Sequence, residues 1–129
     1  MALRDRVPAL IEATQEAAIV TKAVIRVAHL LRLTNACLGE ILGISEATSS
    51  RLKSGNYQLR SGRKEMELAV LLIRLFRGLD AIVGGDEASM RSWMSTTNTA
   101  LNGIPLNLIK NITGINNVVA YMDARRARI

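Results

Sequence analysis

The sequence has few aromatic residues and almost no cysteine. Only 3% of its 129 residues are aromatic, whereas 49% are hydrophobic. Leu, Ile, Val and Ala must therefore form the core, as is usual in helical proteins rather than in β-rich ones. The single cysteine, Cys37, cannot form an internal disulfide, and the opening segment lacks the long apolar run of a signal peptide. We therefore expect a cytoplasmic protein.

Groups that carry catalysis or bind metals are also scarce. The chain has one histidine, His29, and its carboxylates are scattered without a paired arrangement, so neither a catalytic set nor a metal-ligand cluster can be assembled. We expect His29 to be solvated, because it shares a helical stripe with Lys22 and Arg26, and Cys37 to be a small buried hydrophobe. The sequence predicts no enzyme and no cofactor. An enzyme acting on nucleic acid is disfavoured for the same reason.

Acidic residues are outnumbered by basic ones. The chain has 17 Lys and Arg residues against 11 Asp and Glu, which gives a net charge of +6 and a pI of about 10.2. Such a charge favours an acidic partner, and clustered Lys and Arg side chains are typical of proteins that bind nucleic acid phosphates.

The longest amphipathic segment is EMELAVLLIRLFRGLDAIV, from Glu65 to Val83. Its apolar residues cover an arc of roughly 220° on a helical wheel, whereas a surface helix needs a stripe only a little over about 100° wide. Arg74 interrupts it too early for a membrane span of about 20 apolar residues. We expect a central helix that joins an N-terminal unit, residues 1–64, to a C-terminal one, residues 65–129. The alternative is a core helix of a single domain.

The N-terminal unit begins with a segment whose pattern is less clear. Residues 15–33 carry apolar side chains at the spacing of one helical face. Pro8 is expected to precede this helix or to open a short turn. Residues 1–14 are either a separate short helix or a disordered arm, and the sequence does not distinguish the two.

The segment TNACLGEILGISEATSSRLKSGN, residues 34–56, has the features of two short helices joined by a tight turn. Thr34 can cap the first helix, Gly43 can take the positive φ of the turn, and Ser45 can cap the second helix. Gly39 lies where two steeply crossing helices must approach closely. This pattern is typical of the helix-turn-helix, whose second helix lies in the major groove of DNA. The alternative is a plain helical hairpin.

The second helix of this motif, which we expect to run to about Lys53, has a polar outward face. Arg51 can donate two hydrogen bonds to a guanine edge, and Glu46 can accept one from cytosine. Ser49 departs from the motif, because an apolar residue usually packs there on the first helix. Basic residues in the loop that follows are expected to contact phosphates. The candidate DNA-binding residues are Glu46, Ala47, Thr48, Ser50, Arg51, Lys53, Arg60, Arg63 and Lys64.

The C-terminal unit is expected to contain three further helices. Asp86 can cap the first, which carries Trp93, a residue expected in the core. A short helix over residues 106–112 follows and is expected to end at Gly114. A last helix from about Ile115 leads into a basic tail.

Several features of this unit occur in a characteristic order and spacing. They are the Gly84–Asp86 turn, Trp93 with Met94, Asn98, the Leu101–Gly103 turn, Pro105 with Leu106, Gly114 and the closing VVAYMDARR. In this order and spacing the unit resembles the toxin-binding domain of the MbcA/ParS/Xre antitoxin family. With the upstream helix-turn-helix, the resemblance covers nearly the whole chain from about residue 16. The family often has a Thr at the position of Ile104, where it could cap the helix that begins at Pro105. We expect the absence of this cap to cost that helix roughly 1 kcal/mol of stability at most.

The resemblance implies an all-α protein, with a helix-turn-helix unit joined by a long central helix to a small toxin-binding domain. It implies an antitoxin of a bacterial type II toxin–antitoxin system that dimerises, neutralises a RES-domain toxin and represses its own operon. The toxin consumes NAD, whereas this chain would bind none. The alternative is a standalone repressor whose C-terminal half only dimerises.

The toxin-facing surface implied by the resemblance is the C-terminal half, and we place its last helix and tail near the toxin's active site. A cationic tail suits a pocket shaped for an anionic dinucleotide. The candidate toxin-binding residues are Tyr121, Asp123, Arg125, Arg126, Arg128 and Ile129.

Overall fold

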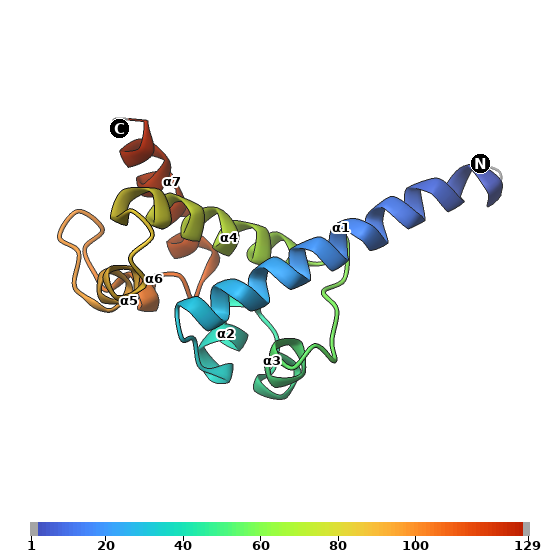
Figure 1. Ribbon diagram of the computed structural model, residues 1–129, viewed down its shortest axis with the longest axis horizontal. Helices are drawn as coiled ribbons and strands as arrows, with labels where there is room; N and C mark the ends of the chain where they lie inside the picture. Colours follow the sequence, from blue (N-terminus) through green and yellow to red (C-terminus); the bar gives the residue numbers. More distant parts are fainter. Residues whose placement is uncertain (1–2, 128–129) are drawn as a thin grey trace.

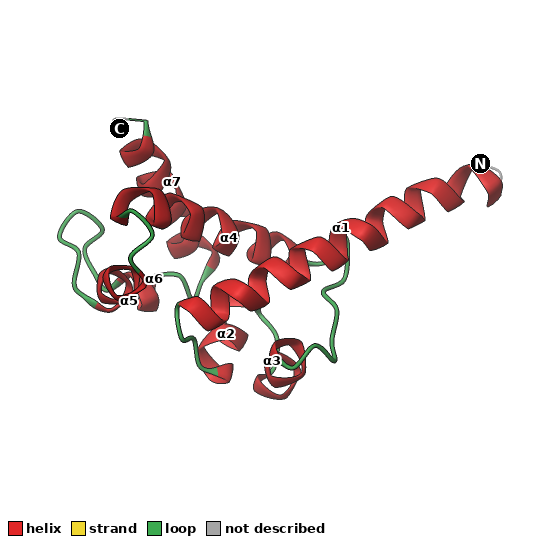
Figure 2. Cartoon of the chain, viewed as in Figure 1, coloured by secondary structure: helices red, strands yellow, loops and turns green. Residues whose placement is uncertain are grey.

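The computed structural model describes the backbone of residues 3–127 and the side chains of residues 7–127. Apart from one isolated bridge between Asn98 and Gly103, the described residues form helices, turns and loops (Figure 2). The chain is therefore all-α, as predicted. Its helices are α1 (Leu3–Leu30), α2 (Asn35–Leu42), α3 (Glu46–Lys53), α4 (Lys64–Val83), α5 (Glu87–Ser95), α6 (Pro105–Leu108) and α7 (Ile112–Arg126).

Helix α4 is the centre of the fold. It packs against α1, α2, α5 and α7, and Figure 1 shows it between α1 and α7. Ala69, Leu72, Leu75 and Leu79 on this helix are fully buried. The wide apolar arc seen in the sequence is thus explained by partners on both sides. A single cluster of buried side chains extends from α1 to α7, so α4 serves both halves of the chain.

Helix α1 is longer than the sequence indicated. It begins at Leu3, passes through Pro8 and ends at Leu30, so the expectation that Pro8 precedes the helix was wrong. A proline near the start of a helix removes one hydrogen bond and disturbs only the short turn before it. The helix ends before Leu33 because Arg32 takes a φ of 53°. Figure 1 shows the N-terminal half of α1 projecting beyond the other helices.

The junction between α6 and α7 also differs from the prediction. Gly114 lies in the first turn of α7 and does not end the preceding helix. A Cβ on Gly114 would lie 1.7 Å from the carbonyl oxygen of Leu108, so the glycine permits the close approach of α7 to the end of α6. The missed signal was Asn111, whose side chain caps α7 by accepting a hydrogen bond from the Gly114 N–H at 2.8 Å.

Candidate functional site

The turn between α2 and α3 has the geometry that the sequence predicted. Thr34 caps α2 by accepting from the Cys37 N–H at 3.0 Å, and Ser45 caps α3 by accepting from the Thr48 N–H at 3.0 Å. Gly43 takes a φ of 69° between the two helices. A Cβ on Gly39 would lie 2.7 Å from the backbone oxygen of Ile44, so this glycine permits the two helices to cross closely.

The inner side of the helix pair is apolar, with one exception. Leu38, Leu42 and Leu52 are fully buried. Ser49 lies among the buried residues of α3, at 0% exposure, and its hydroxyl has no hydrogen-bond partner among the described residues. The serine thus occupies the position that usually carries an apolar side chain, as the sequence indicated.

The outer side of α3 presents most of the predicted DNA-binding residues. Glu46, Ala47, Ser50 and Arg51 are exposed. Because the Thr48 hydroxyl accepts a hydrogen bond from the Arg51 guanidinium at 3.0 Å, Arg51 is held toward the start of α3. The outward face therefore carries an oriented arginine.

Lys53 has a different environment from these residues. Its side chain is half-buried, and its ammonium group donates to the backbone oxygen of Leu33 at 2.7 Å. This contact fastens the end of α3 to the turn after α1. Lys53 is therefore engaged within the protein, whereas we predicted it on the outer face.

The basic residues of the connection between α3 and α4 lie on the surface. Arg60, Arg63 and Lys64 are all exposed. Arg63 and Lys64 stand at the start of α4, where the helix dipole is positive and cations are locally unfavourable. An anionic partner such as a phosphate would relieve this repulsion.

The connection itself is held by a small network of hydrogen bonds. The Tyr57 hydroxyl lies 2.7 and 2.9 Å from the two carboxylate oxygens of Glu65, and the Arg60 N–H donates to the same carboxylate at 3.2 Å. Burial raises the pKa of Tyr57, and the hydrogen bond to Glu65 is the second-largest cause of this increase. Thr21 of α1 accepts from the Leu59 N–H at 3.0 Å. The basic loop is thus fixed to both α1 and α4.

The predicted toxin-binding residues divide between two sides of α7. Tyr121 stacks on Trp93 of α5, with ring centroids 6.4 Å apart, and the Arg125 guanidinium lies over the Tyr121 ring and donates to its hydroxyl at 2.9 Å. Asp123 instead forms an ion pair with Arg74 of α4. Arg126 is exposed on the side of α4. Two further predicted residues, Arg128 and Ile129, lie outside the described residues.

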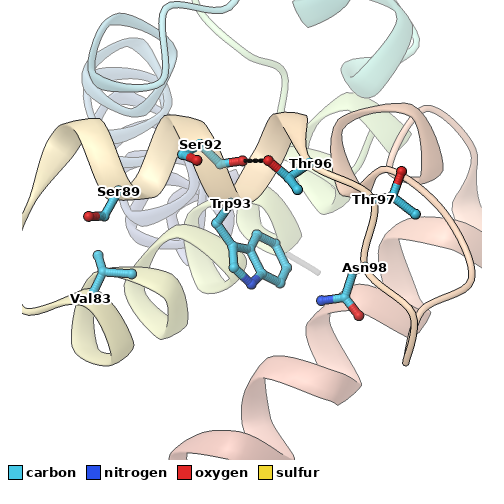
Figure 3. A pocket seen from close by; sticks show the side chains of 7 residues that line it. All are labelled: Val83, Ser89, Ser92, Trp93, Thr96, Thr97 and Asn98. Atoms are coloured by element: carbon cyan, nitrogen blue, oxygen red, sulfur yellow. Dashed lines mark hydrogen bonds between the residues drawn. The ribbon is translucent and has the colours of Figure 1, made fainter.

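A shallow pocket of about 330 Å³ lies beside Trp93, and sequence reasoning did not identify it. Trp93 is half-buried rather than part of the closed core. Figure 3 shows its indole between Val83 and Asn98, and the Thr96 hydroxyl donating to the Ser92 carbonyl at 2.7 Å. Trp93 and Asn98, two of the sequence features that carry the family resemblance, therefore both line this surface pocket.

A second groove, of about 360 Å³, is formed by residues from three helices. It is lined by five apolar residues, Ile19, Val20 and Ala23 of α1 and Val70 and Ile73 of α4, and by three arginines, Arg74, Arg77 and Arg126. Ile19 and Val70 are 68% and 45% exposed. No local pattern predicts this groove, because α1, α4 and α7 come together only in the fold.

The cysteine and the histidine of the described residues, Cys37 and His29, lie in different environments. Burial raises the pKa of the Cys37 thiol above its usual range, which disfavours the reactive thiolate. His29 is exposed, as predicted. Within residues 7–127 no three His, Cys, Asp or Glu side chains gather as metal ligands. None of the described helices is long and apolar enough to span a membrane.

Two families match the chain along most of its length. The antitoxin Xre-like helix-turn-helix domain matches residues 11–74, which contain most of α1, the α2–α3 turn and the start of α4. The antitoxin Xre/MbcA/ParS C-terminal toxin-binding domain matches residues 78–128, which contain the end of α4 and helices α5 to α7. No curated protein matches the chain significantly.

Proposed function

The chain belongs to the Xre-type antitoxin family, and we propose that it neutralises a RES-domain, NAD-consuming toxin by direct binding and represses its own operon. It is the antitoxin of a toxin–antitoxin system and not an enzyme. The observation that carries the proposal is the presence, in one chain, of a helix-turn-helix domain and a toxin-binding domain that share α4.

The exposed face of α3 supports the DNA-binding part of the proposal. Arg51 is oriented by Thr48 and reads a base edge, whereas Arg60, Arg63 and Lys64 contact phosphates. Of the other predicted residues, Glu46, Ala47 and Ser50 are exposed beside Arg51. We propose that α3 enters the major groove of the operator.

The cluster of Trp93, Tyr121 and Arg125 supports the toxin-binding part of the proposal. It is the place where an aromatic pair and an exposed cation of the matched toxin-binding domain lie together. Aromatic and arginine side chains are the usual anchors of protein interfaces. We propose that this cluster and the tail that follows it face the active site of the RES toxin.

The remaining features of the proposal follow from these two activities. Residues 1–64 form the DNA-binding unit and residues 65–129 the toxin-binding unit. The chain acts in the cytoplasm, where its operon and its toxin are found. It forms a homodimer that binds two operator half-sites separated by about one helical turn or a multiple of it, and it assembles with the toxin into a hetero-oligomer.

Co-expression with the product of the neighbouring gene tests the proposal. We expect affinity purification of this chain to retain a RES-domain protein whose NAD consumption is suppressed. A purified chain that retains no partner, but binds its own promoter tightly and in a salt-dependent manner, would instead be a standalone repressor whose C-terminal half only dimerises.

A further inference from the structure

The groove between α1, α4 and α7 crosses the boundary of the two matched domains. Its members from α1 and most of those from α4 lie within the helix-turn-helix match, residues 11–74, whereas Arg126 of α7 lies within the toxin-binding match, residues 78–128. Its apolar lining is open to solvent, since Ile19 and Val70 are 68% and 45% exposed. Neither matched domain contains the whole groove, so a partner that fills it contacts both.

Two of the three arginines in the groove have no acidic partner within the described residues. Arg74 forms an ion pair with Asp123 of α7. Arg77 and Arg126 are exposed, and neither forms an ion pair with a described residue. A Cβ on Gly78 would lie 3.4 Å from Cδ of Arg126, so the stem of this arginine lies against α4. The groove therefore combines an apolar lining with two positive charges that no described carboxylate pairs.

Operator DNA does not account for these charges. On α1 the groove is formed by Ile19, Val20 and Ala23, whereas the connection from α3 to α4 is bonded to Thr21. Ile19 and Thr21 are about 200° apart around the helix. Figure 1 shows α3 and the C-terminal end of α7 on opposite sides of α1 and α4. A duplex in contact with α3 would therefore leave the groove open.

We propose that the groove binds an acidic, amphipathic segment of the toxin, with its apolar side chains against α1 and α4 and its carboxylates on Arg77 and Arg126. This inference rests on the antitoxin function proposed above and extends the toxin contact from α7 to α1. Guanidinium groups pair with carboxylates through two parallel hydrogen bonds, and burial of the exposed aliphatic side chains stabilises the complex. A second copy of this chain, of net charge +6, complements the groove less well than an acidic partner does.

The groove is continuous with the candidate toxin-binding residues of α7. Tyr121 and Arg125 lie toward Trp93 of α5, whereas Asp123 and Arg126 lie toward α4, and Arg126 lines the groove itself. A toxin that contacts both the aromatic cluster and the groove would hold α7 from two sides. Such a contact explains why the candidate toxin-binding residues divide between two sides of one helix.

Titration of the purified toxin with antitoxin variants tests the charge requirement, with inhibition of NAD consumption as the readout. We expect Arg77→Glu to raise the toxin dissociation constant at least about tenfold, because a carboxylate would face the acidic segment. Lys22→Glu is the matched control. Lys22 is an exposed cation of α1 that lies outside the groove, in a pocket beside Tyr57 and Gln58, and its replacement should leave the constant within about threefold.

A second pair of variants tests the apolar lining of the groove. Ile19→Asp changes a side chain that is 68% exposed, so it should leave the fold intact, and we expect it to raise the toxin dissociation constant at least about tenfold. Its matched control is Ile11→Asp. Ile11 is an isoleucine of the same helix that is 52% exposed and does not line the groove, so its replacement should leave the constant within about threefold.

Photo-crosslinking identifies the occupant of the groove. In a chain with p-benzoylphenylalanine in place of Ile19, irradiation of the co-purified complex should join the groove to a toxin peptide that carries Asp or Glu beside apolar residues. Mass spectrometry of the crosslinked peptides measures this. A crosslink to a second copy of this chain alone, to a toxin peptide without acidic residues, or to no protein would overturn the proposal.

The outcomes separate this inference from the proposed function. A wild-type chain that retains no toxin would overturn both. If the wild-type chain retains and inhibits the toxin, but Arg77→Glu and Ile19→Asp bind the toxin as tightly as their controls do, the antitoxin function stands and the groove proposal alone fails.

Discussion

The hydroxyl of Ser49 is a polar group in an unfavourable, buried position. It is fully buried on α3 without a hydrogen-bond partner among the described residues, and an unsatisfied buried hydroxyl costs about 1 to 3 kcal/mol. We expect Ser49→Ala to raise the free energy of unfolding by about 1 kcal/mol. Urea denaturation would measure it, with exposed Ser50→Ala as the control. A loss of stability in Ser49→Ala would show that the hydroxyl has a partner.

Arg51 and Lys64 are both exposed cations of the DNA-binding unit, but they are expected to act differently. Arg51→Ala should cost roughly 1 to 3 kcal/mol on operator DNA and relax base preference, because Arg51 reads a base edge. Lys64→Ala should weaken binding to all sequences alike and lower the salt slope by about one, because it contacts a phosphate. Titrations on operator and random DNA at several salt concentrations measure both. Equal losses on both DNAs for both variants would refute these roles.

At the scale of helices, caps proved easier to predict from the sequence than helix junctions. The caps at Thr34, Ser45 and Asp86 are where the sequence placed them, because a cap is a contact between neighbours in the chain. Gly114 was assigned to the wrong helix. A glycine can end a helix, or it can allow another segment of backbone to approach closely. At Gly114 only the position of the Leu108 carbonyl group distinguishes these two roles.

The junction at Gly114 gives a prediction about the stability of the toxin-binding domain. In Gly114→Ala the new Cβ would collide with the carbonyl group of Leu108, and since this obstacle is backbone, α6 and α7 would have to separate. We expect a loss of more than about 2 kcal/mol in the free energy of unfolding. Exposed Asn117→Ala on the same helix is the control, expected within about 0.5 kcal/mol of wild type. Similar denaturation midpoints for both variants would contradict the close approach.

At the scale of the whole molecule, the tail is expected to act on the toxin and not on the fold. A chain ending at Ala124 keeps the buried Met122 and the stack of Tyr121 on Trp93, so we expect it to fold and to bind operator DNA. It should bind the toxin at least about tenfold more weakly, because it lacks the cations proposed to enter the active site. Inhibition of NAD consumption by titrated antitoxin measures this.

The control for the truncation is Lys22→Ala with Arg26→Ala, which removes two cations from the exposed face of α1. This variant should inhibit the toxin as well as the wild-type chain does. If the chain ending at Ala124 did the same, the tail would not be the inhibitor.

The all-α class, the α2–α3 turn and the central helix α4 could be predicted from the sequence alone. Each depends on features of residues that are close together in the chain. These features are capping side chains, a glycine with positive φ, and an apolar periodicity that can be recognised without knowing what packs against it. The exposed positions of most predicted DNA-binding residues also follow from helical periodicity. Helical periodicity did not predict the half-buried position of Lys53, because the Leu33 carbonyl oxygen that it contacts is distant in sequence.

Which partner each apolar or charged helical face contacts depends on how the whole chain packs. This packing divided Tyr121 and Asp123 between α5 and α4, formed the arginine-lined groove from three helices, and buried Ala17, Val24 and Ala28 of α1 while leaving Val7, Leu10 and Ile11 exposed. Periodicity shows that a helical face is apolar, but not what packs against it. That choice depends on contacts between segments far apart in the chain, which pack cooperatively when the whole chain folds.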